Sequence, residues 1–142
     1  ELGWGREVPL LFIVAERDSL LPLHGMRGLF ERAADPKKMV VLLDADHMHF
    51  CDRPEQVHEL FRSAPPVHAM LQLDGPVPPF GELCPAEHAL TAVRGLSLAH
   101  FDAHLRDHTG ALELLDNELM SELSRRGVAI DVERGGYAIA RG

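Results

Sequence analysis

Cysteine is scarce in this chain of 142 residues, which contains only Cys51 and Cys84. Two cysteines are too few for the disulfide framework of a small secreted domain. The sequence also lacks a charged and then apolar leader. Its longest apolar run, residues 8–15, falls far short of the roughly 20 residues that a membrane-spanning helix needs. We therefore expect a soluble, cytoplasmic protein without a membrane partner.

Basic residues are also in short supply, since 14 Lys and Arg residues stand against 22 Asp and Glu residues. The formal net charge of -8 leaves no basic surface field for phosphate backbones or anionic lipid headgroups. This charge excludes nucleic acid as an expected partner. A small neutral or cationic ligand is the better match.

Two apolar runs, each followed by acidic residues, stand out in what the sequence does contain. Residues 8–15 and 39–43 lack the alternation of a half-exposed strand, which indicates strands buried on both faces. Between them, apolar residues recur every three or four positions from Pro22 toward Asp35, which predicts an amphipathic helix. A strand, a helix and a strand in this order form a βαβ unit with parallel strands. The predicted fold class is therefore α/β, with a short parallel sheet flanked by helices.

The next segments combine a helix with a proline-rich stretch. Asp52, with a Glu three residues later, has the spacing of a capping box, so a helix is predicted over residues 52–62 with Leu60 and Phe61 facing the core. Residues 64–85 contain six prolines, which predicts a loop without regular structure. Long loops of this kind often serve as lids or binding loops, and a plain surface excursion is the alternative.

Two helices and a tail complete the chain. One helix is predicted over residues 86–106 and another over residues 111–126, which ends at the capping Gly127. The tail, residues 128–142, alternates apolar and polar residues around a Gly pair and predicts a terminal hairpin, with a frayed end as the alternative. The apolar residues expected to form the buried stripe of the longer helix are Ala89, Leu90, Val93, Leu96, Ala99, Phe101 and Leu105.

Asp18 and His47 each follow the carboxyl end of one predicted strand. Ligand sites of open α/β sheets lie at this edge, where loops collect side chains. Neighbouring strands are only about 5 Å apart, so short loops can bring the aspartate to the imidazole. A carboxylate on one ring nitrogen fixes the His tautomer and leaves the other nitrogen free to act as a general base. Asp18 and His47 are therefore the candidate catalytic pair.

The two strand ends resemble those of a known enzyme family. The run V-P-L-L-F-I-V-A-E-R-D over residues 8–18 and the run V-V-L-L-D-A-D-H over residues 40–47 are similar to the last two core strands of the α/β-hydrolase superfamily. The resemblance is to dienelactone-hydrolase-like and acyl-peptidase-like esterases, and it extends through residue 62 and to the helix at 96–106. It implies that Asp18 is the acid and His47 the base of a catalytic triad. It also implies a small ester or acyl substrate and no cofactor or metal.

The sequence departs from this family in one essential part. The nucleophile of the family lies before the acid, on a strand-turn-helix elbow with the pattern G-x-S-x-G, and no such pattern precedes Asp18. The nearest match, around Ser97, follows His47 and lies in a predicted helix. The oxyanion-hole loop is missing as well, and the chain starts at Glu1 without a Met. We therefore expect residues 1–142 to be the C-terminal portion of a single hydrolase domain, inactive without the rest.

Two histidine patterns offer a metal site as an alternative. His47 and His49, with Cys51 nearby, are faintly similar to the H-x-H-x-D-H motif of metallo-hydrolases, but two later positions carry the wrong residues. A second set recurs every four residues, a spacing that permits metal binding on one helix face, with solvated surface histidines as the other interpretation. This second set is His100, His104 and His108.

Other residues and another class of protein compete with the catalytic pair. Asp44 and Asp46 are alternative partners for the imidazole, although side chains so near in sequence rarely reach the ring nitrogens in the needed orientation. Cys51 is an alternative nucleophile, with an inert thiol as the other interpretation. The rival to an enzyme is a non-catalytic binding or assembly module. Such a module pairs with another chain, or with a second copy, through the unpaired edge of the strand at residues 8–15.

Overall fold

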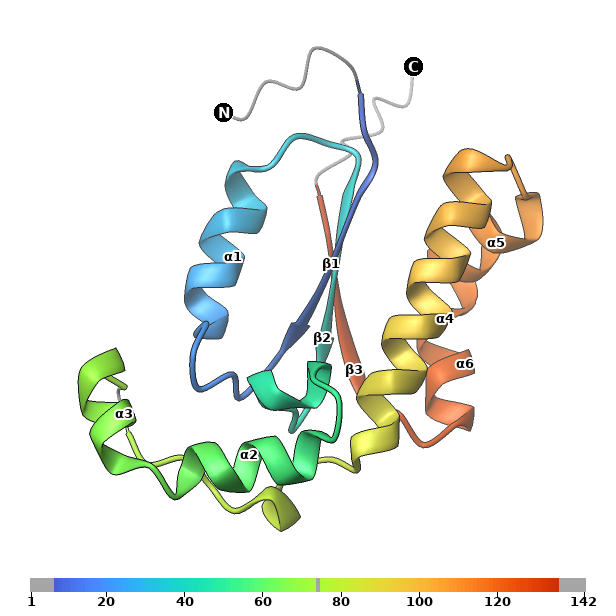
Figure 1. The fold of residues 1–142 in the computed structure, drawn as a ribbon. Coiled ribbons are helices and arrows are strands. Elements are labelled where there is room, and N and C mark those ends of the chain that lie inside the picture. The colour runs from blue at the N-terminus through green and yellow to red at the C-terminus, as the bar shows by residue number, and fades with distance from the viewer. Residues whose placement is uncertain (1–6, 74, 136–142) are drawn as a thin grey trace.

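Three strands form one mixed sheet in the computed structural model, which describes residues 7–73 and 75–135 (Figure 1). The strand order is β1-β2-β3, in which β1 and β2 run parallel and β3 runs antiparallel to β2. The strands are β1 (Leu10–Ala15), β2 (Lys37–Leu42) and β3 (Ile130–Arg134). The α/β class and the parallel βαβ unit are confirmed, whereas the predicted short parallel sheet is a mixed sheet, because β3 is antiparallel.

The tail is the source of this difference. In the described part of the tail, β3 pairs with β2, with Ile130 opposite Leu42 and Arg134 opposite Lys38. Val128 and Ile130 are buried there, and an isolated hairpin offers no comparable burial. The second half of the predicted hairpin, residues 137–139, lies outside the described residues.

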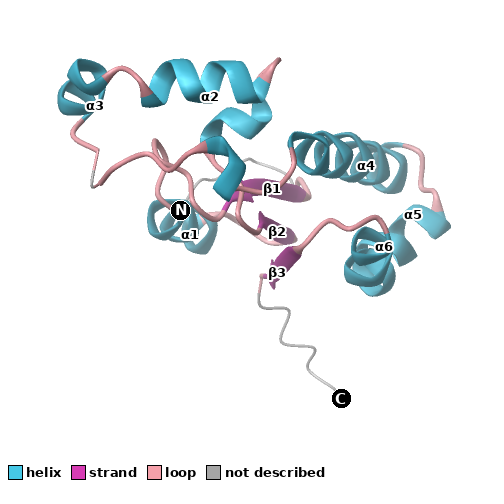
Figure 2. Cartoon of the chain, turned by 90° about the horizontal axis from the view of Figure 1, so that it is seen from below, coloured by secondary structure: helices cyan, strands magenta, loops and turns pink. Residues whose placement is uncertain are grey.

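Helices cover both faces of the sheet (Figures 1 and 2). On one face, Phe30 of α1 (Leu23–Arg32) packs edge-to-face on Phe12 of β1, with 5.5 Å between ring centroids. On the other face lie α4 (Ala86–Leu105) and α6 (Leu119–Arg125). The larger core forms on this second face, and its buried members include Val40, Leu42, Ala92, Leu96, Ala99, Leu115, Leu119, Leu123, Val128 and Ile130.

The predicted helix at 111–126 is divided into three parts. It consists of α5 (Thr109–Glu113), a π-helical turn η3 (Leu114–Glu118) and α6. Its core residues Leu115, Leu119 and Leu123 are buried as expected, whereas Leu112 lies at the surface. Gly127 has φ +76°, a left-handed conformation that suits glycine, and it ends α6 as predicted.

The buried stripe of α4 differs from the predicted one. Three of the predicted residues are exposed, namely Leu90, Phe101 and Leu105. The buried set is Ala89, Ala92, Leu96, Ala99 and Ala103. Alanines let the helix lie close to the sheet, so the large side chains turn outward because the interface is close-packed and has no room for them.

Two short helices lie beyond the carboxyl ends of β1 and β2 (Figure 1). These are α2 (Pro54–Arg62) and α3 (Pro65–Leu71), and the chain then reaches the 3-10 turn η2 (Phe80–Glu82). The prediction that prolines exclude regular structure from residues 64–85 is therefore wrong. Pro65 and Pro66 occupy the first turn of α3, where a helix needs no N–H from them.

The start and the inner face of α2 also differ from the prediction. Arg53, with φ 54°, precedes the first helical residue Pro54, so Asp52 is not the cap. Leu60 is exposed and His58 is fully buried in its place. Within residues 7–73 and 75–135, no helix has both the length and the apolar content that crossing a bilayer requires.

Candidate functional site

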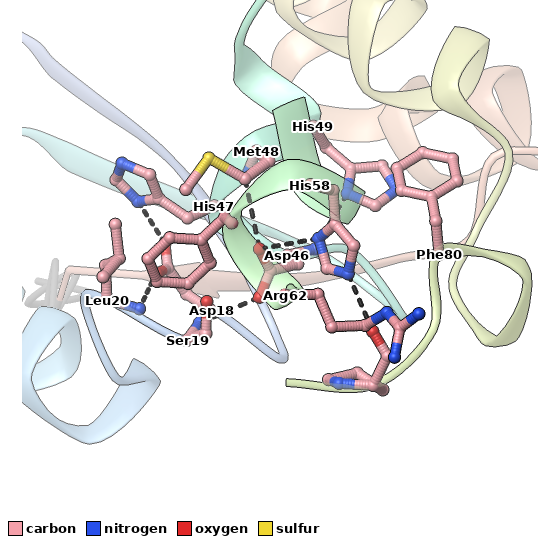
Figure 3. Close-up of polar contacts among 12 residues, drawn as sticks. Asp18, Ser19, Leu20, Asp46, His47, Met48, His49, His58, Arg62 and Phe80 are labelled. Atoms are coloured by element: carbon pink, nitrogen blue, oxygen red, sulfur yellow. Dashed lines mark hydrogen bonds and ion pairs between the residues drawn. The ribbon is translucent and has the colours of Figure 1, made fainter. Parts of the chain in front are cut away.

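Asp18 and His47 lie in contact at the carboxyl edge of the sheet, where the sequence predicts them (Figure 3). Asp18 follows β1, and His47 opens the 3-10 turn η1 (His47–Phe50) after β2. Oδ2 of Asp18 is 3.0 Å from Nδ1 of His47. The Asp18 side chain is 7% exposed and the His47 side chain 32% exposed. The imidazole therefore stays accessible while the carboxylate is shielded from water.

Backbone amides hold the second oxygen of Asp18. Oδ1 accepts a hydrogen bond from the N–H of Leu20 at 2.9 Å and another from the N–H of Leu21 at 2.7 Å. Aspartate favours such turns because its short carboxylate reaches amides a few residues further on. One oxygen is thus tied to its own loop and the other faces His47. A turn-forming role and a His-orienting role coexist in this side chain.

The turn that carries His47 is built by the residues on either side of it. Oδ1 of Asp46 accepts from the N–H of Met48 at 3.2 Å, which caps the start of η1. The N–H of Asp46 donates to Nδ1 of His49 at 3.0 Å, and Nε2 of His49 lies 2.9 Å from the carbonyl oxygen of Cys84. The His49 ring is therefore protonated on Nε2, the nitrogen that faces an acceptor.

The competing carboxylates have other partners. Oδ1 of Asp44 lies 3.6 Å from the guanidinium of Arg17 at the surface. Oδ2 of Asp46 accepts from the N–H of Ser19 at 3.0 Å. Asp18 is therefore the carboxylate that orients His47, in agreement with the sequence prediction.

This geometry defines the tautomer of His47. An ionised carboxylate only accepts hydrogen bonds, so Nδ1 of His47 is the protonated nitrogen. Nε2 is then the nitrogen that can receive a proton. A fixed tautomer, a shielded carboxylate and an accessible ring are what general base catalysis requires.

A groove of about 560 Å³ adjoins the acid, and its lining includes Asp18, Leu20, Leu71 and Pro78. Its volume is in the range of small-molecule sites. A second groove, of about 420 Å³, is lined at the opposite end of the strands by Pro9, Pro36 and other residues. Because that end is remote from Asp18, the first of these two grooves is the one that lies beside the acid, whereas His47 is not among the residues that line it.

The histidine patterns do not form a metal site in the described part of the chain, where no three His, Cys, Asp or Glu side chains converge to hold an ion. Both ring nitrogens of His49 are engaged as described above. Nδ1 of His108 accepts from the N–H of Ala111 and caps α5. The rings of His100 and His104 pack edge-to-face with 4.6 Å between centroids, and burial, followed by that neighbour, lowers the pKa of His100.

No nucleophile is joined to His47 by a hydrogen bond among residues 7–73 and 75–135. Ser97 lies in the interior of α4, without a preceding strand, and so is no nucleophile elbow. Cys84 is half-buried, and this burial, together with the negative charge of Asp44, raises the pKa of its thiol to about 11. Cys51 is exposed just after η1.

The two thiols are expected to differ in reactivity. Since the thiolate is the attacking form, raising the pKa of Cys84 to about 11 leaves it protonated at pH 8, and partial burial blocks it further. We expect iodoacetamide to alkylate Cys51 about 100-fold faster than Cys84. Peptide mass spectrometry over a time course measures both rates in one sample, and equal rates contradict the assigned difference.

Sequence reasoning missed His58 and the partner role of Phe80. His58 is buried on α2, and Phe80 stacks on the ring of His49 with 4.7 Å between centroids. The signal for His58 was its place beside Val57 and Phe61 on the inner side of α2, but its polarity favoured an exposed position.

Comparison with protein-family models, curated proteins and solved structures found no match to this chain.

Proposed function

We propose that this chain supplies the acid and the base of a serine hydrolase that opens carboxylic ester or related acyl bonds. In this proposal residues 1–142 form the C-terminal part of an α/β-hydrolase fold, and the nucleophile belongs to a segment outside them. The observation that carries the proposal is the contact between Oδ2 of Asp18 and Nδ1 of His47 at 3.0 Å. The free thiols of Cys51 and Cys84 suit a reducing, cytoplasmic setting.

The proposed chemistry uses His47 as a proton shuttle. Nε2 takes the hydroxyl proton of the serine as its oxygen attacks the acyl carbon, and the imidazolium then gives this proton to the leaving alcohol. In the second half of the cycle, Nε2 takes a proton from water as the water oxygen attacks the acyl-enzyme. The imidazolium then returns this proton to the serine oxygen as the bond to the acyl group breaks and the carboxylic acid leaves. Asp18 stays ionised throughout and stabilises the imidazolium through Nδ1.

The unpaired edge of β1 is where a further strand, with the proposed nucleophile after it, can join the sheet. Within the described residues β1 pairs with β2 on one side and stands at the edge of the sheet on the other. A parallel strand added there ends at the same edge as β1, about 5 Å away. A nucleophile following that strand therefore comes near the loops that carry Asp18 and His47.

A serine-directed fluorophosphonate tests this function. We expect no labelling of the isolated 142-residue chain. We expect stoichiometric labelling of the longer polypeptide that carries it, at a serine outside residues 1–142, with loss of label in the presence of a competing ester. Labelling of the isolated chain at one of its own serines contradicts the proposal.

The same edge supports a second candidate, a non-catalytic module that binds another chain through β1. Edge strands with unpaired backbone groups are templates for such pairing. The fluorophosphonate experiment separates the two candidates, because a module leaves the longer polypeptide unlabelled as well.

A further inference from the structure

A second carboxylate and imidazole pair, Asp46 and His58, lies beside Asp18 and His47 and is fully buried (Figure 3). Oδ1 of Asp46 is 3.4 Å from Nδ1 of His58, and both side chains are 0% exposed. The other ring nitrogen of His58, Nε2, lies 2.8 Å from the carbonyl oxygen of Pro78. A carbonyl oxygen only accepts, so Nε2 carries a proton.

Nδ1 of His58 faces Oδ1 of Asp46 and is shielded from water, although at 3.4 Å it makes no well-formed hydrogen bond. A ring protonated on Nε2 alone turns its lone pair toward this carboxylate, which is repulsive, whereas a proton on Nδ1 makes the contact attractive. Asp46 and His58 therefore form a buried carboxylate and imidazole pair.

Asp46 stands between the two loops of the catalytic pair. Oδ2 accepts from the N–H of Ser19, the residue after Asp18, at 3.0 Å. Oδ1 accepts from the N–H of Met48, the residue after His47, at 3.2 Å. The carboxylate of Asp46 thus holds the loop that carries Asp18 with one oxygen and the turn that carries His47 with the other.

His58 is itself held from two sides. Oε1 of Glu59 accepts from the N–H of Phe80 at 2.9 Å, which fastens the segment containing Pro78 to α2. This amide, followed by the guanidinium of Arg62, lowers the pKa of Glu59 and so keeps it ionised as an acceptor. The ring of Phe80 packs edge-on against His58 with 5.4 Å between centroids. The imidazole therefore has a fixed direction toward Asp46.

We propose that Asp46 and His58 are positioning residues, which set the distance between Asp18 and His47 by holding their two loops on one buried carboxylate and imidazole pair. Buried pairs of this kind often add little net stability, and in some proteins such polar groups instead select one geometry. The inference rests on the proposed function only in calling His47 a base. The statement that Asp46 and His58 fix the contact between Asp18 and His47 can be tested in the isolated chain.

The test uses two substitutions of His58 that each retain one donor. The amide nitrogen of Asn matches Nδ1, so His58→Asn still donates to Asp46 but not to Pro78. The amide nitrogen of Gln matches Nε2, so His58→Gln still donates to Pro78 but not to Asp46. His68→Asn is the matched control, because His68 also contacts a carbonyl oxygen, that of Phe61, at 2.7 Å.

Imidazole ¹⁵N–¹H spectra of the 142-residue chain provide the measurement. The native chain is expected to show His47 protonated on Nδ1 and His49 protonated on Nε2. In His58→Gln the His47 Nδ1–H signal is lost through faster exchange with water, while the backbone amide spectrum stays dispersed. The signal persists in His58→Asn and in His68→Asn.

An unchanged His47 signal in folded His58→Gln overturns the proposal, as does equal loss in folded His58→Asn. If the His58 variants do not fold, Asp46→Asn supplies the same readout, since it is isosteric but uncharged. Loss of the His47 signal there supports the proposal and retention overturns it. None of these spectra depends on hydrolysis, so a failed esterase assignment is recognised separately by the fluorophosphonate experiment.

Discussion

In the serine hydrolase that we propose, replacing His47 by alanine is expected to lower kcat for a chromogenic ester by roughly 10⁴- to 10⁶-fold. The expected loss is large because, in the proposed mechanism, Nε2 serves both as the base for attack and as the acid for the leaving group. KM is expected to change little, since the imidazole of the proposed mechanism acts on the reacting atoms. Steady-state turnover of a nitrophenyl ester measures both constants.

Asp18→Asn tests the acid without dismantling its loop. The amide oxygen of Asn can still accept from the N–H groups of Leu20 and Leu21, which Oδ1 of Asp18 now does at 2.9 and 2.7 Å. The amide nitrogen then faces Nδ1 of His47 and favours the opposite tautomer, in which Nε2 is protonated and cannot act as a base. We expect kcat to fall about 10⁴-fold.

The double variant and a surface histidine complete this experiment. His47→Ala combined with Asp18→Asn is expected to be no slower than His47→Ala alone, because residues that act as a unit are not additive. His24→Ala, at an exposed position of α1, is expected to retain native turnover. If His47→Ala turns over the ester near the native rate, His47 is not the catalytic base.

The prediction that Asp18 and His47 lie close together holds for a simple physical reason. Two uninterrupted apolar runs demand burial on both faces, and a helix between them demands parallel strands, so both loops must meet at one edge. This argument needs no knowledge of side-chain contacts. The observed register, in which Ala15 lies opposite Leu42, brings the two strands to that edge together.

The direction of the Asp46 side chain and the burial of His58 depend on tertiary contacts, which the sequence does not reveal. Asp46 precedes His47 directly, yet its carboxylate turns toward Ser19 and His58. Nothing in the local pattern distinguishes this direction from one toward the imidazole of His47. His58 is buried because the loop at Pro78 brings it a carbonyl acceptor from 20 residues away. A polar residue whose partners are distant in sequence looks like a surface residue until the fold is known.

The helix α4 shows the same limit for apolar residues. The prediction gave weight to the largest side chains, but helix packing against the sheet selected small ones. The available signal was a row of small residues that recurs every three or four positions along the helix. The row consists of Ala89, Ala92, Ala99 and Ala103, with Leu96 at its middle position. Large residues on the outer face, such as Leu98 at 60% exposed, contribute little to the core.

Leu96→Ala is accordingly expected to lower the free energy of unfolding by about 2–5 kcal/mol. Leu96 is 2% exposed and is the one large residue among the four buried alanines of α4. It shares the larger core with Val40 and Leu42 of β2, so its removal leaves a cavity that alanine neighbours cannot fill. Urea unfolding, followed by far-UV circular dichroism, measures the change.

Leu98→Ala on the same helix is the matched control, because it removes the same atoms from an exposed position. Its expected effect is below about 0.5 kcal/mol, since surface substitutions seldom exceed this and alanine favours the helix slightly more than leucine does. The difference between the two variants isolates burial from helix propensity. Equal losses of stability place Leu98 in an interface of the folded chain, and α4 then packs through its outer face as well as through its alanines.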